Sequence, residues 1–239
     1  MAEKIVIYNA AALFDWPNQG FNIRLTEELE RIGYEVILPQ RDGFEFANLL
    51  KAFEGILPEK DIPNATNRII YFLDIGEFIG KRSNIVLARL DEPIDEGVVK
   101  EICFAKTARI PIIGYRTSIT TPFGPASGET RGAHFFPPYT CDNFFLISPS
   151  FRTSTEEKSK LEQFAGGISS IVQDINPLAR IFDYNKQIPD EVEDAVRIAK
   201  TLFSGVSNIH SENSLRKIAG RYAENIGMIE AALPQIIRI

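Results

Sequence analysis

The part of the chain best suited to chemistry is a group of carboxylates between residues 91 and 101. Asp91, Asp95 and Glu101 all lie in this stretch, directly after the short apolar run of residues 85–90. Two carboxylates that share one crevice can have different pKa values, so that one stays charged and the other carries a proton to donate. A charged carboxylate can attack an electron-poor carbon. This pattern predicts a site whose chemistry depends on carboxylates.

The acidic stretch lies inside a predicted strand–loop–helix–strand unit at residues 84–116. Val98, Ile102 and Ala105 follow the i, i+4, i+7 spacing of a helix that packs one stripe against a sheet. Open α/β sheets bind their ligands in the crevice at the carboxyl ends of the strands. We therefore expect the carboxylates to lie at such a crevice.

Each carboxylate also has an ordinary structural interpretation. Asp95 precedes the predicted helix and could simply cap it. Glu101 cannot point fully to solvent if Val98 and Ile102 are buried, so it needs a partner, and the helix dipole favours its charged form. The residues alone indicate a carboxylate site in an α/β crevice and leave the catalytic and the structural interpretation open.

Five short apolar runs predict the strands of a sheet, and helical patterns separate most of them. The runs lie at residues 4–8, 34–38, 85–90, 111–115 and 142–147. This order predicts an α/β fold, a flavodoxin-like or Rossmann-like doubly wound parallel sheet of about five strands, within residues 1–150. Residues 151–239 are predicted to form a C-terminal helical extension that packs on the core or serves oligomerisation.

The connections between the strands differ in how clearly they can be assigned. Residues 22–32 have the pattern of an amphipathic helix. Residues 58–67 are predicted to be a loop and residues 68–81 a helix, in which Asp74 stands among apolar positions and could face either solvent or a site. Residues 116–139 contain many Gly and Pro residues and are predicted to form a long loop.

Composition excludes several classes of function. The 239 residues carry a net charge of −6, which argues against general nucleic-acid binding. Two Cys and two His residues are too few for a usual zinc cluster, and Cys103 is predicted to be a small core residue. No apolar run approaches the roughly 18–20 residues of a membrane span. No signal peptide is visible before the first strand, so we expect a cytoplasmic protein.

Two common nucleotide-binding patterns are missing from the sequence. The first strand is not followed by G-x-G-x-x-G, and the chain has no G-x-x-x-x-G-K-[ST]. These patterns mark dinucleotide sites and P-loops, respectively. We therefore expect no cofactor.

Four segments of the chain resemble the nucleoside 2-deoxyribosyltransferase family. They are the first strand and its exit at Ile7–Phe14, the second strand at Gly33–Gln40, the third strand with the D-x-G-x-x-x-E pattern at Asn84–Glu101, and the fourth strand at Pro111–Thr117. The resemblance covers roughly residues 4–147. It is carried by the order of these segments more than by any one of them.

The resemblance implies a double-displacement reaction. Glu101 would attack the anomeric carbon of a 2′-deoxynucleoside and form a glycosyl-enzyme, and a second nucleobase would then accept the sugar with net retention. Tyr8 would hold Glu101 by a hydrogen bond, although it could also be an ordinary core aromatic. Asp95 and Asp74 would contact the base and the sugar, and one of them would supply a proton to the leaving base.

Further residues would bind the substrate. Gln40 would hydrogen-bond the base edge, and Asn143 would reach into a neighbouring subunit to hold the 5′-hydroxyl. Asp91, which follows the strand end, is predicted to belong to the same binding site. The expected partners are 2′-deoxynucleosides and free nucleobases, with neither nucleic acid nor a membrane. The family completes its sites across a subunit interface, so a homo-oligomer is implied.

Departures from the family pattern leave other readings open. Glu92 stands where the family usually has Gly, Phe145 where it often has Met, and Ala10–Ala12 replace a common Ala-Gly-Pro. One alternative is a nucleoside or nucleotide N-glycoside hydrolase on the same scaffold, although Asp95 would repel a 5′-phosphate. Another is a nucleoside-binding protein without catalysis.

Overall fold

The computed structural model describes residues 4–120, 124, 128–130, 132, 134, 136–175 and 188–234. The chain divides into two compact units. The first comprises residues 1–41 and 82–187, and the second comprises residues 42–81 and 188–239.

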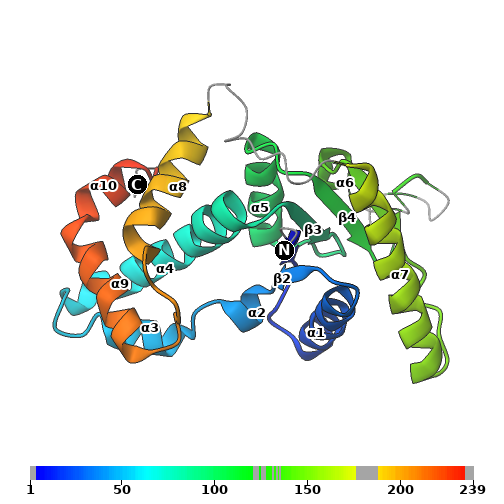
Figure 1. The fold of residues 1–239 in the computed structure, drawn as a ribbon, viewed down its shortest axis with the longest axis horizontal. Helices are drawn as coiled ribbons and strands as arrows, with labels where there is room; N and C mark the ends of the chain where they lie inside the picture. Colours follow the sequence, from blue (N-terminus) through cyan, green and yellow to red (C-terminus); the bar gives the residue numbers. More distant parts are fainter. Residues whose placement is uncertain are drawn as a thin grey trace. The chain divides into compact units, whose positions relative to one another are not determined.

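All five strands belong to the first unit and run parallel in one sheet (Figure 1). They are β1 Val6–Ala10, β2 Glu35–Ile37, β3 Ile85–Arg89, β4 Ile112–Arg116 and β5 Asn143–Leu146. Their spatial order is β2-β1-β3-β4-β5. This is the order of a flavodoxin-like doubly wound sheet, and the predicted fold class is confirmed.

The two faces of the sheet are covered by different helices of the first unit. These helices are α1 Trp16–Arg31, α5 Glu96–Thr107, α6 Phe136–Thr140 and α7 Ser154–Asp174, with the short α2 Pro39–Asp42 after β2. Ile7, Leu87 and Ile113 form one core cluster with residues of α1 and α7. Tyr8 has the opposite strand parity and bonds to α5, so α5 covers the other face.

Helix α1 begins six residues before the predicted helix at 22–32. Asp15 is its N-cap, and its carboxylate accepts a hydrogen bond of 2.8 Å from the backbone N–H of Asn18. Pro17 stands in the first turn, where its missing N–H is tolerated. The N-cap therefore starts the helix at Trp16, whereas the apolar pattern alone predicts a start at residue 22.

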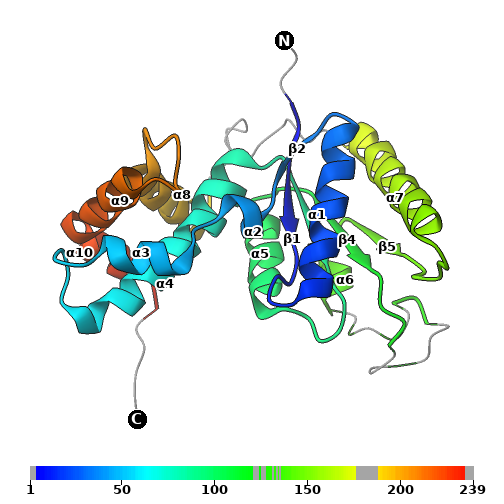
Figure 2. The same cartoon turned by 90° about the horizontal axis from the view of Figure 1, so that it is seen from below.

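The predicted division of the chain at residue 150 differs from the observed one. Phe164 and Ile168 of α7 belong to the core cluster of the sheet. This helix lies beside α1 (Figure 2) and is part of the first unit. The second unit instead combines residues 42–81 with the C-terminal helices. An apolar stripe reveals that a helix is buried and does not reveal which partner buries it.

The second unit is helical. Its elements are α3 Phe46–Ala52, the 3-10 helix η1 Glu59–Asp61, α4 Ile62–Phe72, α8 Asp190–Phe203, α9 Glu212–Glu224 and α10 Ile226–Ala231, and α4 continues into the π-helix η2 Leu73–Arg82. Gly76 packs so close to α8 that a Cβ there would lie 2.4 Å from the carbonyl oxygen of Ala195. This contact ties η2 to α8 within the unit.

Three local predictions are wrong. The expected loop at 58–67 contains η1 and the start of α4, because Pro63 stands in the first helical turn. The expected loop at 116–139 contains the start of α6. Cys103 is exposed, because Val98, Ile102 and Ala105 form the buried stripe and Cys103 falls on another face of α5.

None of the helices in the described part of the chain is both long and apolar enough to cross a lipid bilayer.

Candidate functional site

A cavity of about 880 Å³ opens at the carboxyl ends of β1, β3 and β4 in the first unit. We call it the strand-end cavity. It is lined by Ala12, Phe14, Asp15, Asn18, Arg89, Asp91, Glu92, Pro93, Ile94, Asp95, Glu96, Gly97, Thr117 and Ser118. This is the edge at which doubly wound sheets bind ligands, and the acidic stretch lies there as predicted.

Tyr8 and Glu101 meet on the α5 face of the sheet. The Tyr8 hydroxyl donates a hydrogen bond of 2.7 Å to Oε1 of Glu101, which joins β1 to α5 across 93 residues of sequence. Tyr8 is fully buried and Glu101 is partly buried. The hydroxyl fixes one oxygen of the Glu101 carboxylate relative to β1.

The Tyr8–Glu101 pair lies beside the strand-end cavity without lining it. Gly97 lines the cavity, and Glu101 follows it by four residues on the same face of α5. The backbone of Glu101 is therefore about one helical turn, or roughly 6 Å along the axis, from a residue of the cavity wall.

Asp95 is the N-cap of α5. Its Oδ1 accepts hydrogen bonds from the backbone N–H groups of Gly97 at 2.8 Å and Val98 at 3.2 Å. A Cβ on Gly97 would lie 2.9 Å from this oxygen, which explains why the motif has glycine two residues after the aspartate. Oδ2 makes no hydrogen bond among the described residues. Asp95 can therefore cap the helix with one oxygen and offer the other to the strand-end cavity.

Asp91 is held by groups from the ends of two strands. Its carboxylate accepts from the backbone N–H groups of Thr117 at 2.7 Å and Ser118 at 2.6 Å, and from the Thr117 hydroxyl at 2.6 Å. Nε of Arg89 completes the set at 2.7 Å. Burial alone would raise the pKa of Asp91, but the Thr117 hydroxyl and the Arg89 charge lower it below its ordinary value. Asp91 is thus a fixed anion that ties β3 to β4.

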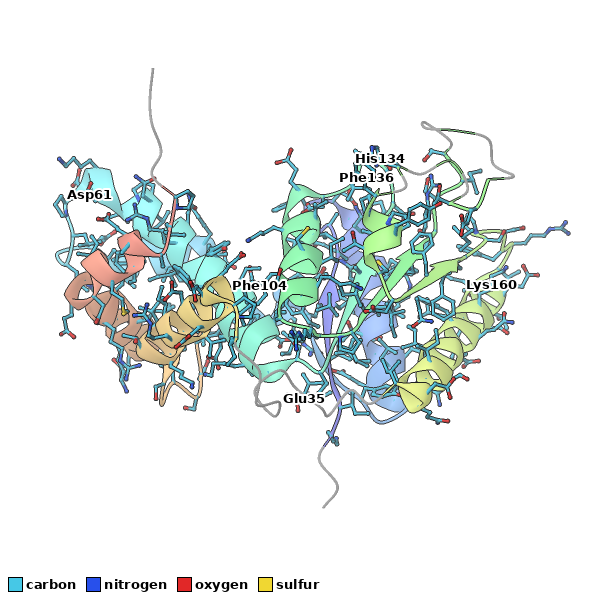
Figure 3. All side chains as sticks on the ribbon, turned by 90° about the horizontal axis from the view of Figure 1, so that it is seen from above. Glu35, Asp61, Phe104, His134, Phe136 and Lys160 are labelled. Carbon is cyan, nitrogen blue, oxygen red and sulfur yellow. The ribbon has the colours of Figure 1, made fainter. Side chains whose placement is uncertain are left out.

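Glu92 lines the strand-end cavity and binds the backbone of His134. The backbone N–H of His134 donates a hydrogen bond of 3.2 Å to Glu92, which lines the strand-end cavity. The His134 ring packs edge-on against Phe136, with centroids 5.0 Å apart (Figure 3). Glu92 therefore holds the backbone of His134, two residues before α6.

Asp74 belongs to the second unit, in η2. Its side chain is partly buried and forms no hydrogen bond or ion pair with any described residue. Burial raises the pKa of this carboxyl to about 7. Asp74 is thus partly buried in η2, and its contact with a substrate remains a prediction.

Gln40 and Asn143 occupy places outside the lining of the strand-end cavity. Gln40 accepts a hydrogen bond of 3.1 Å from Asn22 and donates one of 3.2 Å to the Gln19 carbonyl. Asn143 begins the edge strand β5 and has the same strand parity as Phe145, whose ring packs on Phe164 of α7. Among the described residues, its side chain forms no hydrogen bond. Their proposed contacts with substrate remain predictions.

The sequence reasoning overlooked Arg89 and Thr117. Both line the strand-end cavity, and Arg89 is largely buried, with its side chain 13% exposed. A charged residue inside the apolar run 85–90 was the available signal, because a strand buried on both faces seldom carries a charge without a partner. The described residues contain no group of three or more His, Cys, Asp or Glu side chains placed to hold a metal ion.

Comparisons with known proteins add little to this geometry. No family model matches the chain, and no curated protein matches it. Four chains among solved structures match. One is the sugar isomerase domain of an RpiR transcription factor from Sphaerobacter thermophilus, which is 9% identical with a TM-score of 0.35, over 76% of this chain and 77% of that one. A likeness this distant carries no argument about function.

Proposed function

We propose that this chain is a nucleoside 2-deoxyribosyltransferase, which moves the 2-deoxyribosyl group between nucleobases. The observation that carries the proposal is the hydrogen bond of 2.7 Å between the Tyr8 hydroxyl and Glu101. It gives a carboxylate beside the strand-end cavity the fixed orientation that a nucleophile needs. The resemblance of four sequence segments to the transferase family supports the same assignment.

In the first step, an oxygen of Glu101 bonds to the anomeric carbon and the bond from that carbon to the base nitrogen breaks. The leaving base takes a proton from a carboxylic acid. In the second step, the nitrogen of another base attacks the same carbon, the bond to Glu101 breaks, and the incoming base returns the proton. Two inversions give net retention.

The family resemblance implies that Asp95 or Asp74 supplies this proton, and the raised pKa of Asp74 suits a donor. A carboxyl with a pKa of about 7 holds a proton in a useful fraction of molecules at neutral pH. Asp91 suits this role poorly, because its pKa is lowered and it accepts four bonds. Asp95 would contact the substrate with the oxygen that the helix cap leaves free.

The lining of the strand-end cavity supports an unphosphorylated substrate. Five carboxylates line it, namely Asp15, Asp91, Glu92, Asp95 and Glu96. Arg89 is the one basic residue in the lining, and it is paired with Asp91. Carboxylates at this density repel a phosphate group, so the favoured substrates are free 2′-deoxynucleosides and nucleobases.

We also propose that the protein is a homo-oligomer. Large apolar side chains in the segments that follow the strands are exposed, among them Phe14 at 85% and Trp16 at 88%. Ile119, Phe136 and Tyr139 are also more than half exposed. Apolar side chains gathered around a site support an interface there, and a neighbouring subunit would then supply Asn143.

Incubation with deoxyinosine and adenine, followed by chromatography, tests the activity. Deoxyadenosine that forms only when adenine is present is the expected result. Release of free deoxyribose at a rate independent of adenine would instead identify a hydrolase. Binding of deoxyinosine without turnover would identify a nucleoside-binding protein.

The nucleophile is tested by Glu101→Gln, which keeps the shape of the side chain and removes its charge. We expect transfer to fall more than about a thousandfold, and the deoxyribosyl adduct on the peptide containing Glu101 to disappear from mass spectra of the quenched enzyme. Glu162→Gln, which changes an exposed glutamate of α7, serves as control. Transfer within tenfold of the wild type in Glu101→Gln would refute the assignment.

A further inference from the structure

A second, smaller cavity of about 190 Å³ lies between α1, α7 and the exit of β5 in the first unit. We call it the aromatic slot. Three phenylalanine rings line it, Phe21, Phe151 and Phe164, together with the basic residues Arg24, Arg89 and Lys160. Its walls therefore combine aromatic surface with positive charge.

The guanidinium of Arg89 is only partly used by the groups around it. Nε donates to Asp91 at 2.7 Å and Nη2 donates to Thr117 at 3.2 Å. Nη1 is buried and has no hydrogen-bond partner among the described residues. The guanidinium is planar, so Nη1 points away from the edge that binds Asp91. Its Cζ lies 4.8 Å from the centroid of the Phe21 ring in the slot wall.

A second polar atom without a partner lies next to Arg89. Tyr115 pairs with Arg89 across β3 and β4, and its hydroxyl is buried without a hydrogen bond among the described residues. The Tyr115 ring packs on Phe21 and Phe164, with centroids 6.2 Å and 5.1 Å away. The Tyr115 ring is therefore packed against two residues of the slot wall. Buried donors without partners destabilise a fold, and a bound oxygen acceptor would satisfy both.

The charges around the slot are suited to an anion. Arg24 is paired with Glu157 at 2.9 Å. Lys160 of α7 (Figure 3) donates to the Ser148 carbonyl at 3.3 Å and has no carboxylate partner among the described residues. The charge of Arg89 is neutralised by its ion pair with Asp91. The slot therefore carries one net positive charge, on the ammonium group of Lys160.

We propose that the aromatic slot binds a small aromatic carboxylate. The ring would lie between Phe21, Phe151 and Phe164, and the carboxylate would accept hydrogen bonds from Nη1 of Arg89 and the Tyr115 hydroxyl, under the positive potential of Lys160. The size agrees, since an apolar cavity of about 150 Å³ holds benzene and the slot measures about 190 Å³. The slot shares Arg89 and Thr117 with the strand-end cavity, and its proposed ligand does not rest on the proposed transferase activity.

Benzoate is the probe, and calorimetric titration of the full-length protein is the measurement. We expect benzoate to bind at least about tenfold more tightly than benzyl alcohol, which lacks the charge, and than acetate, which lacks the ring. Benzoate binding no tighter than acetate would reduce the site to a nonspecific cationic surface and overturn the proposal. So would equal binding of benzoate and benzyl alcohol.

Two variants of the aromatic slot and one control variant test whether benzoate binds in the slot. Leu161→Trp fills the slot from the partly exposed start of α7 and should weaken benzoate binding at least about tenfold. Lys160→Gln should weaken it about threefold to fivefold, while Lys158→Gln, an exposed lysine outside the slot lining, should leave it within about twofold. Unchanged binding in Leu161→Trp would place benzoate elsewhere and refute the site.

Tyr115→Phe gives an independent test. Loss of a hydroxyl that has no partner should raise the melting temperature of the ligand-free protein by about 2–4 °C. The same change should weaken benzoate binding, because one donor to the carboxylate is lost. A lower melting temperature, or undiminished affinity for benzoate, would contradict the proposal.

Discussion

Asp91 and Asp74 are both enclosed aspartates, and their surroundings act on them in opposite directions. Asp91 accepts bonds from Thr117, Ser118 and Arg89, and its pKa is lowered. Asp74 has no partner among the described residues, and burial raises its pKa to about 7. Burial with donors preserves a charge, whereas burial without them preserves a proton.

Glu101, in the Tyr8–Glu101 pair, differs from both aspartates. Glu101 is partly buried and accepts a short hydrogen bond from a neutral hydroxyl. In the proposed reaction Glu101 is the nucleophile, whereas Asp91 is a fixed anion between two strand ends.

The largest expected effect comes from Asp91→Ala. The change leaves Arg89 buried without its counter-ion, so the free energy of unfolding should fall by about 3–5 kcal/mol, measured by urea denaturation at pH 7. The folded-state pKa of Asp91 is lowered from 3.8, so its stabilising contribution is present above pH 4 and is lost as the pH falls through the folded-state value. The difference between wild type and variant should shrink below pH 4.

Asp174→Ala is the control for this prediction, because Asp174 is exposed at the end of α7. It should change the free energy of unfolding by less than about 0.5 kcal/mol. If Asp91→Ala proves equally mild, the bonds from Thr117, Ser118 and Arg89 do not hold the strand ends together.

Asp74→Asn should act in the opposite direction. The pKa of Asp74 is raised from 3.8 to about 7 in the folded protein. The unfolded chain therefore ionises first, and the wild type loses stability as the pH rises from about 4 to 7. Asn cannot ionise, so the variant should be more stable than the wild type by about 2–4 kcal/mol at pH 8 and by much less at pH 4.

Urea denaturation at both pH values measures this effect, and equal differences at pH 4 and pH 8 would rule out a raised pKa. Transfer activity gives a second measure. If Asp74 is the proton donor, wild-type activity should fall as the pH rises above about 7. The Asn variant should be slow over the whole range.

Asp91 shows which parts of the site can be predicted from the sequence and which cannot. The sheet follows from continuous apolar runs, and the position of Asp91 at a strand end follows from the run before it. Its partners Thr117 and Ser118 come 26 and 27 residues later, and only the register of β3 and β4 brings them together. No local pattern encodes that contact.

The second unit was harder to foresee for a related reason. Residues 42–81 and the C-terminal helices carry apolar stripes, but their pairing depends on contacts such as Gly76 against Ala195 across most of the chain. Periodicity left Asp74 undecided, since the π-helix η2 does not repeat at 3.6 residues. The Tyr8–Glu101 contact was expected only through resemblance to a family, and the structure has it at 2.7 Å.

Tyr8→Phe tests the intermediate case. Removal of the hydroxyl takes away a bond to a charged group, which is worth about 1.5–3 kcal/mol. We expect transfer to fall about tenfold to a hundredfold, because Glu101 loses its fixed orientation. Tyr34→Phe is a matched control, since the Tyr34 hydroxyl bonds the neutral Ser169 at 2.9 Å. It should leave transfer unchanged, and an equal loss in both variants would show that Tyr8 has no special role.

The smallest expected effect separates the two uses of Asp95. Asp95→Ala removes the cap of α5 and should lower the free energy of unfolding by about 1 kcal/mol, whereas Asp95→Asn can still accept from Gly97 and Val98 and should cost only a few tenths. If Asp95 only caps the helix, transfer by the Asn variant should match the wild type. If its second oxygen also binds substrate as an anion, Asp95→Asn should lose about tenfold in transfer while keeping its stability. We expect the latter, because a single residue with one oxygen on the helix and one facing the cavity performs both tasks without conflict.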